Sequence, residues 1–352
     1  MTETTQGARP SSDSQEISEV FRGSADGSTK LKPKGTVKGI EAASIPAFVA
    51  GEELADLGDH DQRIVVLTAD LAGASRTADF QARHPARFFN LGIAEQNMMS
   101  VAAGLASTGL RPYVSTFAAY AGLLCCEQIR TDLAYPGMPV GILAHHSGMS
   151  LGYYGTSHHS LEDLSVTRAI AGLTVVSVAD ANQLRAILRA SLSLTGPIYI
   201  RLGRGRDPEV YPEVPAGFAF GRAIRLTEGS DLTLITHGAE VRPCLDAAEA
   251  LGRDGIGVRV VDMHTISDID ATEVFAAAKE TGAVLTVEEH NITGGMGSAV
   301  AETLLEAGVM TRFLRAGVPD EHVLLGPPAG LYAHYELDAA GVEARARRFL
   351  SA

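Results

Sequence analysis

The chain alternates short apolar runs with longer stretches in which apolar residues recur every three or four positions. The first clear run, Arg63 to Asp70, is continuously apolar in its centre and ends in polar residues, as expected for a strand that is covered on both faces. Further strands are predicted at 87–91, 113–116, 140–144, 174–178 and 198–202. Helices are predicted at 41–58, 94–107, 118–134, 161–171 and 180–194. Strands that alternate with helices indicate βαβ units and a mostly parallel sheet.

A second alternating block follows a stretch rich in Gly, Pro and charge. Its predicted strands are 231–236, 256–262 and 283–288, and its predicted helices are 240–252, 270–280 and 296–307. The fold class is therefore α/β, with two doubly wound domains, the second one smaller. We predict these parts in chain order: a disordered polar arm (1–38), a first domain (39–204), a linker (205–222) and a second domain (223–352).

Composition narrows the function classes. The 352 residues carry a formal net charge of −13, which argues against a general nucleic-acid binder because phosphate binding requires a basic face. No apolar stretch is long enough to span a membrane, and the N-terminus has no secretory pattern. The three cysteines form no C-x-x-C motif, so neither a disulfide framework nor a zinc site is predicted. These features favour a cytoplasmic enzyme.

Ligands of doubly wound sheets bind beyond the carboxyl ends of strands, which selects three segments: Ala69–Ser75, Asn90–Asn97 and His145–His159. The second segment places Glu95 in the first turn of an apolar helix, where an acid can simply complement the helix dipole. The third holds four histidines. Metal binding by its two His-His pairs competes with a substrate-binding role, but neighbouring side chains do not share a face and no further ligand spacing supports it. We predict no metal site within this chain.

Phe117 and Tyr120 are three residues apart at the head of a predicted helix, so their rings share a face. They either pack in the core or line an aromatic pocket.

Several separated motifs, in order along the chain, resemble one known family. They include Gly92-Ile-Ala-Glu-Gln-Asn-Met98, Ser115-Thr-Phe-Ala118, Glu127-Gln-Ile-Arg130, Gly196–Arg204 and Glu288–Ser298. Together they resemble the pyrimidine-binding and C-terminal domains of transketolases, over about residues 40–350.

The resemblance implies a thiamine-diphosphate site. Glu95 matches the glutamate that donates a hydrogen bond to the N1′ atom of the aminopyrimidine, which requires a protonated carboxyl in dry surroundings and activates the cofactor as a carbon nucleophile. His158 matches a catalytic histidine that faces the donor hydroxyls. The implied cofactor-binding residues are Asp70, Leu71, Ile93, Glu95, Phe117 and Tyr120. The implied substrate-binding residues are His146, Tyr154, His158 and Arg204.

The chain departs from the family pattern at the acceptor end. Tyr154 stands where the family usually has an Asp that binds a sugar hydroxyl, and Ala47 falls nearest the position of a phosphate-binding Arg. Arg204 matches the other phosphate arginine. The chain therefore lacks one arginine that would bind the substrate's phosphate and one carboxylate that would bind a sugar hydroxyl. This predicts an unusual aldehyde substrate, unphosphorylated or more apolar.

The family's diphosphate-binding and metal-binding Gly-Asp-Gly motif with its following Asn does not occur in this sequence. The resemblance therefore implies a partner, an N-terminal diphosphate-binding subunit that also holds Mg²⁺, in a heterotetramer of two alpha and two beta chains. The expected activity is transfer of a two-carbon ketol unit from a ketose to an aldehyde.

Three alternatives stay open: a decarboxylating synthase of the acyloin or deoxyxylulose-phosphate type, a dehydrogenase beta subunit, and a non-catalytic stabilising subunit.

Overall fold

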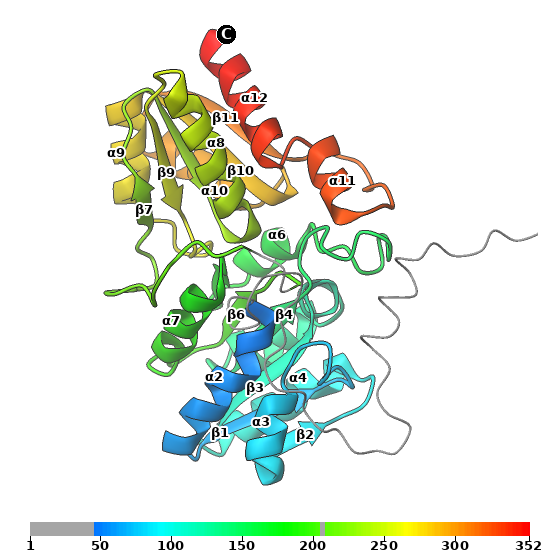
Figure 1. Cartoon of the computed structure of the whole chain (residues 1–352). Helices are drawn as coiled ribbons and strands as arrows, with labels where there is room; N and C mark the ends of the chain where they lie inside the picture. The colour runs from blue at the N-terminus through cyan, green and yellow to red at the C-terminus, as the bar shows by residue number, and fades with distance from the viewer. Residues whose placement is uncertain (1–45, 205–207) are drawn as a thin grey trace, which may run out of the picture.

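The computed structural model describes residues 46–204 and 208–352, and side chains from residue 49 onward. The predicted arm over 1–38 lies outside the described residues, as do the first residues of the helix predicted at 41–58. Within the described ranges the chain forms two α/β domains, each built around its own sheet (Figure 1). The α/β class with two sheet domains is confirmed.

The first sheet holds six strands among the described residues, in the order β2-β1-β3-β4-β6-β5, and every pairing in it is parallel. Its elements are, in chain order, α2 (Pro46–His60), β1 (Ile64–Thr68), α3 (Ala78–Arg83), η2 (Pro85–Arg87), β2 (Phe88–Asn90), α4 (Glu95–Ser107), β3 (Arg111–Phe117), η3 (Tyr120–Leu124), α5 (Cys126–Gln128), η4 (Ile129–Ala134), β4 (Gly141–His145), α6 (Asp163–Arg168), β5 (Thr174–Ser177), α7 (Ala181–Ser191) and β6 (Ile198–Arg201).

Helices cover both faces of this sheet, which explains why its strands are apolar on both sides. Helices α2, α3 and α7 pack on one face, through a cluster that includes Leu54, Phe80 and Ile187. Helices α4 and α6, together with η3 and η4, pack on the other face. The strand order reverses between β1 and β3, and an open α/β sheet binds its ligand at the carboxyl edge of such a switch point.

The second sheet has the order β11-β10-β8-β9-β7 within the described ranges, with β7 antiparallel to β9 and the other pairs parallel. Its elements are β7 (Ile224–Thr227), β8 (Leu232–Thr236), η5 (Gly238–Glu240), α8 (Val241–Arg253), β9 (Val258–Asp262), α9 (Ala271–Thr281), β10 (Ala283–Asn291), α10 (Met296–Glu306), β11 (Arg312–Val318), α11 (Pro328–His334) and α12 (Ala339–Ser351).

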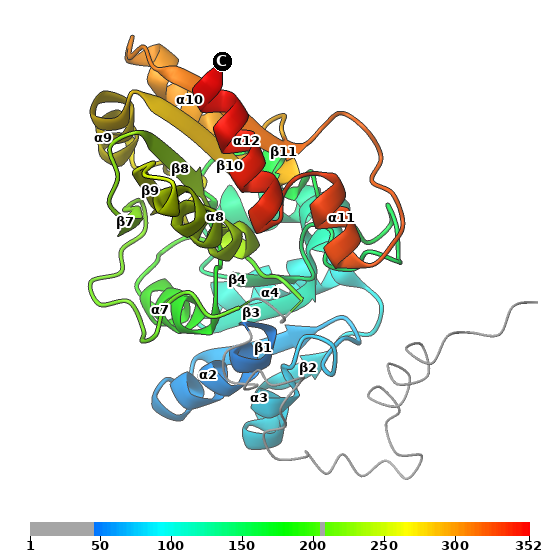
Figure 2. The ribbon, with the colours of Figure 1, turned by 45° about the horizontal axis from the view of Figure 1, so that its top comes forward.

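The two domains share one packed interior. Helices α9 and α10 of the second domain contribute to the same buried cluster as α4 and η3 of the first, and the carboxyl ends of the second sheet's strands lie against the first domain (Figures 1 and 2). Backbone bonds cross the boundary, for example from the Ser177 amide to the His264 carbonyl at 2.9 Å. The first sheet's carboxyl edge is therefore shaped by both domains.

A buried ion pair stands at this boundary. Arg201 Nε donates to the Asp163 carboxylate at 2.9 Å, and neither side chain is more than 2% exposed. Arg201 also donates to the carbonyl oxygens of Ser160 and of Glu289, which is in the second domain, at 3.0 and 2.9 Å. Tyr199 completes the group by donating to Asp163 at 3.0 Å.

The prediction of one continuous α-helix over 118–134 is wrong in the type of helix. Two π-helical turns, η3 and η4, flank the short α5. A Cβ added at Gly122 in η3 would lie 2.7 Å from Asp163 Cβ, so this glycine lets α6 approach closely. Cys125 is buried in this region, and Cys126 is partly exposed. The sequence pattern also missed α3, β7, β11, α11 and α12.

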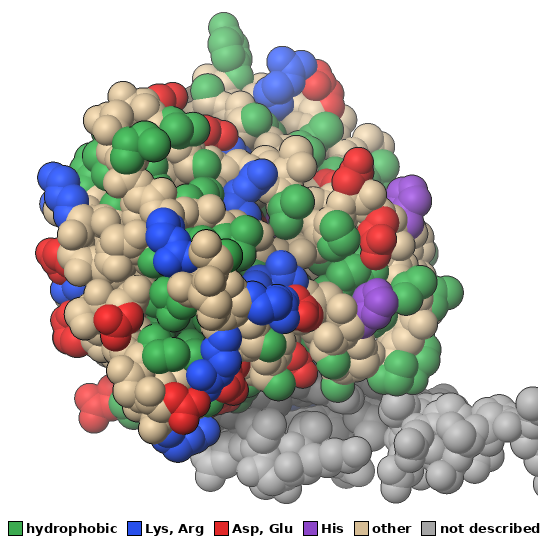
Figure 3. Space-filling model, turned by 90° about the horizontal axis from the view of Figure 1, so that it is seen from above, with side chains coloured by type: hydrophobic (Ala, Val, Ile, Leu, Met, Phe, Trp, Pro, Cys, Tyr) green, Lys and Arg blue, Asp and Glu red, His purple; other side chains and the backbone are tan. Residues whose placement is uncertain are grey.

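No helix in the described part of the chain is both long and apolar enough to cross a membrane. On the face seen from above, acidic and basic side chains are interspersed (Figure 3).

Candidate active site

The loops after β1 and β2 meet at the carboxyl edge of the first sheet. Asp70 follows β1 in a left-handed conformation, with φ of 61°, which costs energy for a residue other than glycine and marks positions held by their surroundings. Asn90 at the end of β2 holds it: its Oδ1 accepts from the Asp70 and Gly92 amides at 3.0 Å, and its Nδ2 donates to Asp70 Oδ1 at 3.0 Å. Sequence reasoning missed Asn90, although a polar residue at a strand's carboxyl end was available as a signal.

Glu95 begins α4 immediately beyond this turn and is 7% exposed. Gly92 turns the chain with φ of 72°, a conformation that glycine adopts without strain. The Gln96 side chain next to Glu95 donates to the Leu124 carbonyl at 3.1 Å, which fixes the start of α4 against η3. Burial and the nearby Glu95 carboxylate together raise the pKa of the Cys125 thiol to about 12. The same two causes raise the pKa of Tyr120, in agreement with the contact between α4 and η3 that the Gln96–Leu124 bond makes.

An aromatic cluster lies beyond the ends of β3 and β4. Phe117 is the last residue of β3 rather than a helical residue as predicted, and Tyr120 starts η3, but their ring centroids are still 5.6 Å apart. The ring of His146 lies 4.7 Å from Phe117, and that of His158 lies 5.8 Å from it.

His158 is fixed from two sides. Tyr120 Oη and His158 Nε2 are 3.0 Å apart, and Ser157 Oγ lies 2.9 Å from His158 Nδ1. The ring of Tyr154 packs 5.0 Å from His158 and is 59% exposed, so it lies at the open side of the cluster. Ser157 was not predicted, because a serine in a Gly/His/Ser loop has no distinguishing pattern.

The structure thus brings together most of the predicted site residues. Glu95, Phe117, Tyr120, His146, Tyr154 and His158 form one group. The His146 amide donates to the Gly203 carbonyl at 3.4 Å, which brings the neighbouring Arg204 to this group as well. Asp70 and Leu71 lie at the β1 end of the same edge. Ile93 is 85% exposed. Ala47 lies in the first turn of α2, where side chains are not described.

No group of three or more His, Cys, Asp or Glu side chains suited to a metal ion occurs in the described part of the chain. In the first of the two His-His pairs the ring centroids of His145 and His146 are 6.4 Å apart and the ring planes are 56° apart.

Two histidines of this edge are expected to remain neutral. Burial lowers the pKa of His145 to about 3, and burial together with Arg204 and His158 lowers that of His146 to about 4. At pH 6 their ¹⁵N chemical shifts, measured on histidine-labelled protein, should be those of neutral imidazoles. An unfolded chain takes up these protons near pH 6.5, so each residue reduces stability as the pH falls from about 6.5 toward its folded pKa. Shifts of imidazolium at pH 6 would contradict the buried geometry.

Comparisons with known proteins agree with this geometry. Residues 47–208 match the model of the transketolase pyrimidine-binding domain, and residues 221–342 match that of the transketolase C-terminal domain. The chain is 38% identical to one subunit of the apulose-4-phosphate transketolase of Phocaeicola vulgatus, over 85% of this chain and 95% of that protein. It is 34% identical to 1-deoxy-D-xylulose-5-phosphate synthase 1 of Geobacter metallireducens, over 92% of this chain but 52% of that protein.

Among solved structures, a split-gene transketolase described as an inactive beta4 tetramer superposes with a TM-score of 0.77 at 41% identity. The match covers 87% of this chain and 97% of that one.

Proposed function

Because the chain belongs to the transketolase family, we propose that it is the beta-type subunit of a split transketolase and supplies the pyrimidine-binding half of a thiamine-diphosphate site. The assembled enzyme transfers a two-carbon ketol unit from a ketose to an aldehyde acceptor. Relatives of nearly the same extent support the split arrangement, since one is named as a single subunit of a transketolase and another as the product of a split gene.

One observation carries this proposal: a buried carboxyl, Glu95, begins α4 where that helix is bonded to η3, the turn that carries Tyr120 of the aromatic cluster. The set fits an aminopyrimidine, because an aromatic ring can stack on its face and an acid can bond to its ring nitrogen. Glu95 would hold the proton at N1′, and Tyr120 and Phe117 would stack on the ring. When bound, thiamine diphosphate supplies a carbon nucleophile.

The remaining cofactor contacts come from the rim of this cluster. Asp70 and Leu71 would contact the cofactor from the end of β1. Ile93, at 85% exposure, would contact it only once a partner covers this edge.

The segment His145–His159, which holds four histidines, would bind the substrate. His158, held by Tyr120 and Ser157, would face the donor hydroxyls and take part in proton movement there. The His146 amide donates to the carbonyl of Gly203, next to Arg204, and His146 and Arg204 would line the acceptor's end of the site.

A second chain would provide the diphosphate and Mg²⁺ half of the site, in an assembly of two alpha and two beta chains. No cluster of metal ligands occurs among the described residues. Large apolar side chains flank Glu95 and lie open to solvent: Phe89 at 40%, Ile93 at 85%, Leu123 at 41% and Leu124 at 50%. Apolar surface of this kind next to a binding site favours a protein partner.

The acceptor would differ from the usual sugar phosphates, because Tyr154 offers a largely exposed ring where the family has a carboxylate. A relative named for apulose 4-phosphate supports a specialised ketose substrate.

The deoxyxylulose-phosphate type of synthase is the second candidate, favoured by the match over 92% of this chain. The match to this synthase is less specific than the matches to split transketolases, because the chain covers only 52% of the synthase. A dehydrogenase beta subunit and a non-catalytic subunit have weaker support, since the buried carboxyl and the aromatic cluster are both present.

Reconstitution tests the proposal. The chain is combined with its diphosphate-binding partner, thiamine diphosphate and Mg²⁺, and ketose donors are screened with phosphorylated and unphosphorylated aldoses. We expect ketol transfer, and no CO₂ release from pyruvate. Pyruvate-dependent CO₂ release would instead support the synthase. Efficient use of xylulose 5-phosphate with ribose 5-phosphate would refute the unusual acceptor.

A further inference from the structure

The loop His146–His159, which we call the acceptor loop, belongs to the first domain but is held largely by the second. Both ends of the loop are held by the first domain: the Ser147 amide donates to the Leu202 carbonyl, and Gly148 pairs with Ser160. Its middle, from residue 148 to residue 155, contacts β10 and the segment after β11.

Glu289 of β10 makes the first of these contacts. It is 1% exposed, and its Oε1 accepts the Met149 amide at 2.7 Å. Tyr332 of α11 donates its hydroxyl to the same oxygen. A Cβ at Gly148 would lie 1.9 Å from the Glu289 carboxyl carbon, so the loop backbone lies directly on this side chain. Met149 is buried in the second domain's core cluster.

The second contact is made by residues 319–327, which connect β11 to α11 and which we call the strap. The Gly326 amide donates to the Gly152 carbonyl at 3.1 Å. A Cβ at Gly155, whose φ is 74°, would lie 2.8 Å from Leu325 Cδ2. Leu325 therefore lies against the turn that directly follows Tyr154.

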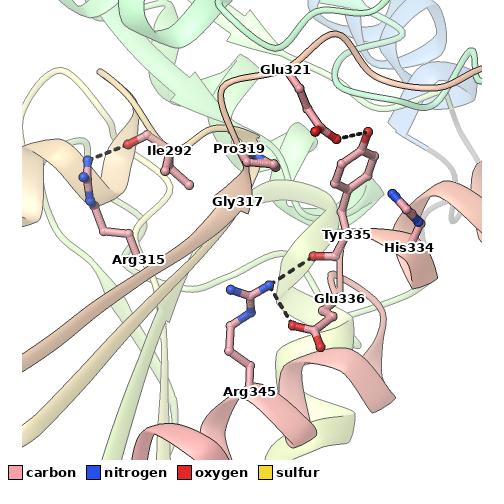
Figure 4. Close-up of a pocket in the computed structure, with 9 residues that line it drawn as sticks. All are labelled: Ile292, Arg315, Gly317, Pro319, Glu321, His334, Tyr335, Glu336 and Arg345. Carbon is pink, nitrogen blue, oxygen red and sulfur yellow. Dashed lines mark hydrogen bonds and ion pairs between the residues drawn. The ribbon is translucent and has the colours of Figure 1, made fainter.

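The strap is anchored at its root. Tyr335 donates its hydroxyl to Glu321 Oε1 at 3.0 Å. The two residues line a cavity of about 290 Å³ between β11 and α12 (Figure 4). Between this anchor and Gly326 the strap has no regular structure, so its position depends on its two ends and on the contact of Leu325 with the loop.

We propose that the second domain is the positioning element of the acceptor site, with Glu289 and Leu325 as positioning residues. They hold the acceptor loop so that Tyr154, packed on His158, faces the incoming aldehyde. This inference rests on the proposed ketol transfer, and it assigns the second domain a part in acceptor binding.

The cofactor half of the site has separate supports. Glu95, Phe117 and Tyr120 come from α4, β3 and η3, and β3 is paired on both sides within the first sheet. Loosening the strap should therefore impair acceptor binding more than the donor step, because His158, the loop residue that faces the donor, stays hydrogen-bonded to Tyr120 of the first domain.

The test compares Leu325→Ala with Leu324→Ala. Leu324 is a matched control because it lies next in the same strap and is 56% exposed, against 67% for Leu325. Hydrogen exchange is measured on the full chain over residues 149–159 and 326. For Leu325→Ala we expect exchange at least about tenfold faster, because the loop opens locally more often. Leu324→Ala should match the wild type.

Kinetics on the reconstituted complex give the second readout. Hydroxypyruvate serves as the donor, followed by CO₂ release, and D-ribose as the acceptor. Leu325→Ala should raise the acceptor KM about tenfold, because small displacements of positioning groups weaken productive binding. At saturating acceptor the maximal rate of CO₂ release should fall by a smaller factor than the acceptor KM rises, and the affinity for thiamine diphosphate should stay at the wild-type value. Tyr335→Phe, which frees the strap root, should act in the same direction. Glu289→Gln, which keeps an acceptor oxygen for Met149, should retain more acceptor affinity than Glu289→Ala.

Wild-type exchange in Leu325→Ala would overturn the proposal, and so would faster exchange with an unchanged acceptor KM. A complex that performs no ketol transfer even as wild type would refute the proposed function instead, and the exchange comparison would still decide whether the strap holds the loop.

Discussion

Replacing Glu95 by glutamine is expected to lower the turnover of the assembled enzyme by about 10²–10⁴-fold, the range that a positioned proton donor or acceptor contributes. Glutamine has nearly the same shape and can still donate an N–H, but it cannot exchange a proton with a ring nitrogen. The carboxyl is 7% exposed in the first turn of α4, so the substitution removes its acid chemistry and keeps the packing. Steady-state ketol transfer by the reconstituted complex is the measurement.

The matched control for this prediction is Glu249→Gln. Glu249 forms an exposed ion pair with Arg253, in which its side chain is 71% exposed, and its replacement should leave turnover unchanged. Circular dichroism of both variants should match the wild type. Turnover of Glu95→Gln within a fewfold of wild type would remove this residue from the mechanism.

Replacing Asp163 by alanine is expected to reduce the free energy of unfolding by about 3–5 kcal/mol, because it leaves the buried Arg201 guanidinium without its counter-charge. Both side chains are within 2% of complete burial. Tyr199 loses its acceptor in the same variant. Since Arg201 also binds the Glu289 carbonyl, the effect should extend across the domain boundary. Urea unfolding followed by far-ultraviolet circular dichroism measures the loss.

The exposed Arg253–Glu249 pair again provides the comparison. Breaking it with Glu249→Ala should cost about 0–1 kcal/mol, as for solvated pairs in general. A loss below about 1 kcal/mol for Asp163→Ala would mean that Arg201 finds other partners, and that the pair is not the main support of this boundary.

The strands of both sheets were largely predictable from the sequence, because strands buried on two faces are runs of apolar residues. Ile64–Thr68 and Val258–Asp262 are buried along their whole length, and both were predicted within two or three residues. By contrast β11, Arg312–Val318, is only partly buried over its first four residues and carries two arginines, so it gave no such signal.

The helix after β3 illustrates a second limit. Apolar spacing predicts a helix over 118–134, but it cannot distinguish α-helical from π-helical turns. The choice is made by packing: Gly122 lies against Asp163, some forty residues later in the chain.

The residues of the candidate site were predictable from the sequence, but the residues that hold them in position were not. Glu95, Phe117, Tyr120 and His158 stand out through motif resemblance, and the structure brings them together. Their surroundings are held by Asn90, which bonds Asp70 twenty residues earlier, by Ser157, which bonds His158, and by Glu289, which bonds Met149 at a separation of 140 residues. Short polar residues in such roles have no periodicity, so only the folded structure identifies them.

The central claim is that the Glu95 carboxyl meets the aminopyrimidine of a cofactor whose diphosphate is held by another chain. A crystal structure of the assembled complex with thiamine diphosphate and Mg²⁺ tests it most directly. The account predicts a carboxyl oxygen within about 2.5–3.0 Å of the N1′ atom, with the pyrimidine against Tyr120 and the diphosphate on the partner chain. A Glu95 carboxyl that faces solvent in that complex, or a cofactor bound elsewhere, would contradict it.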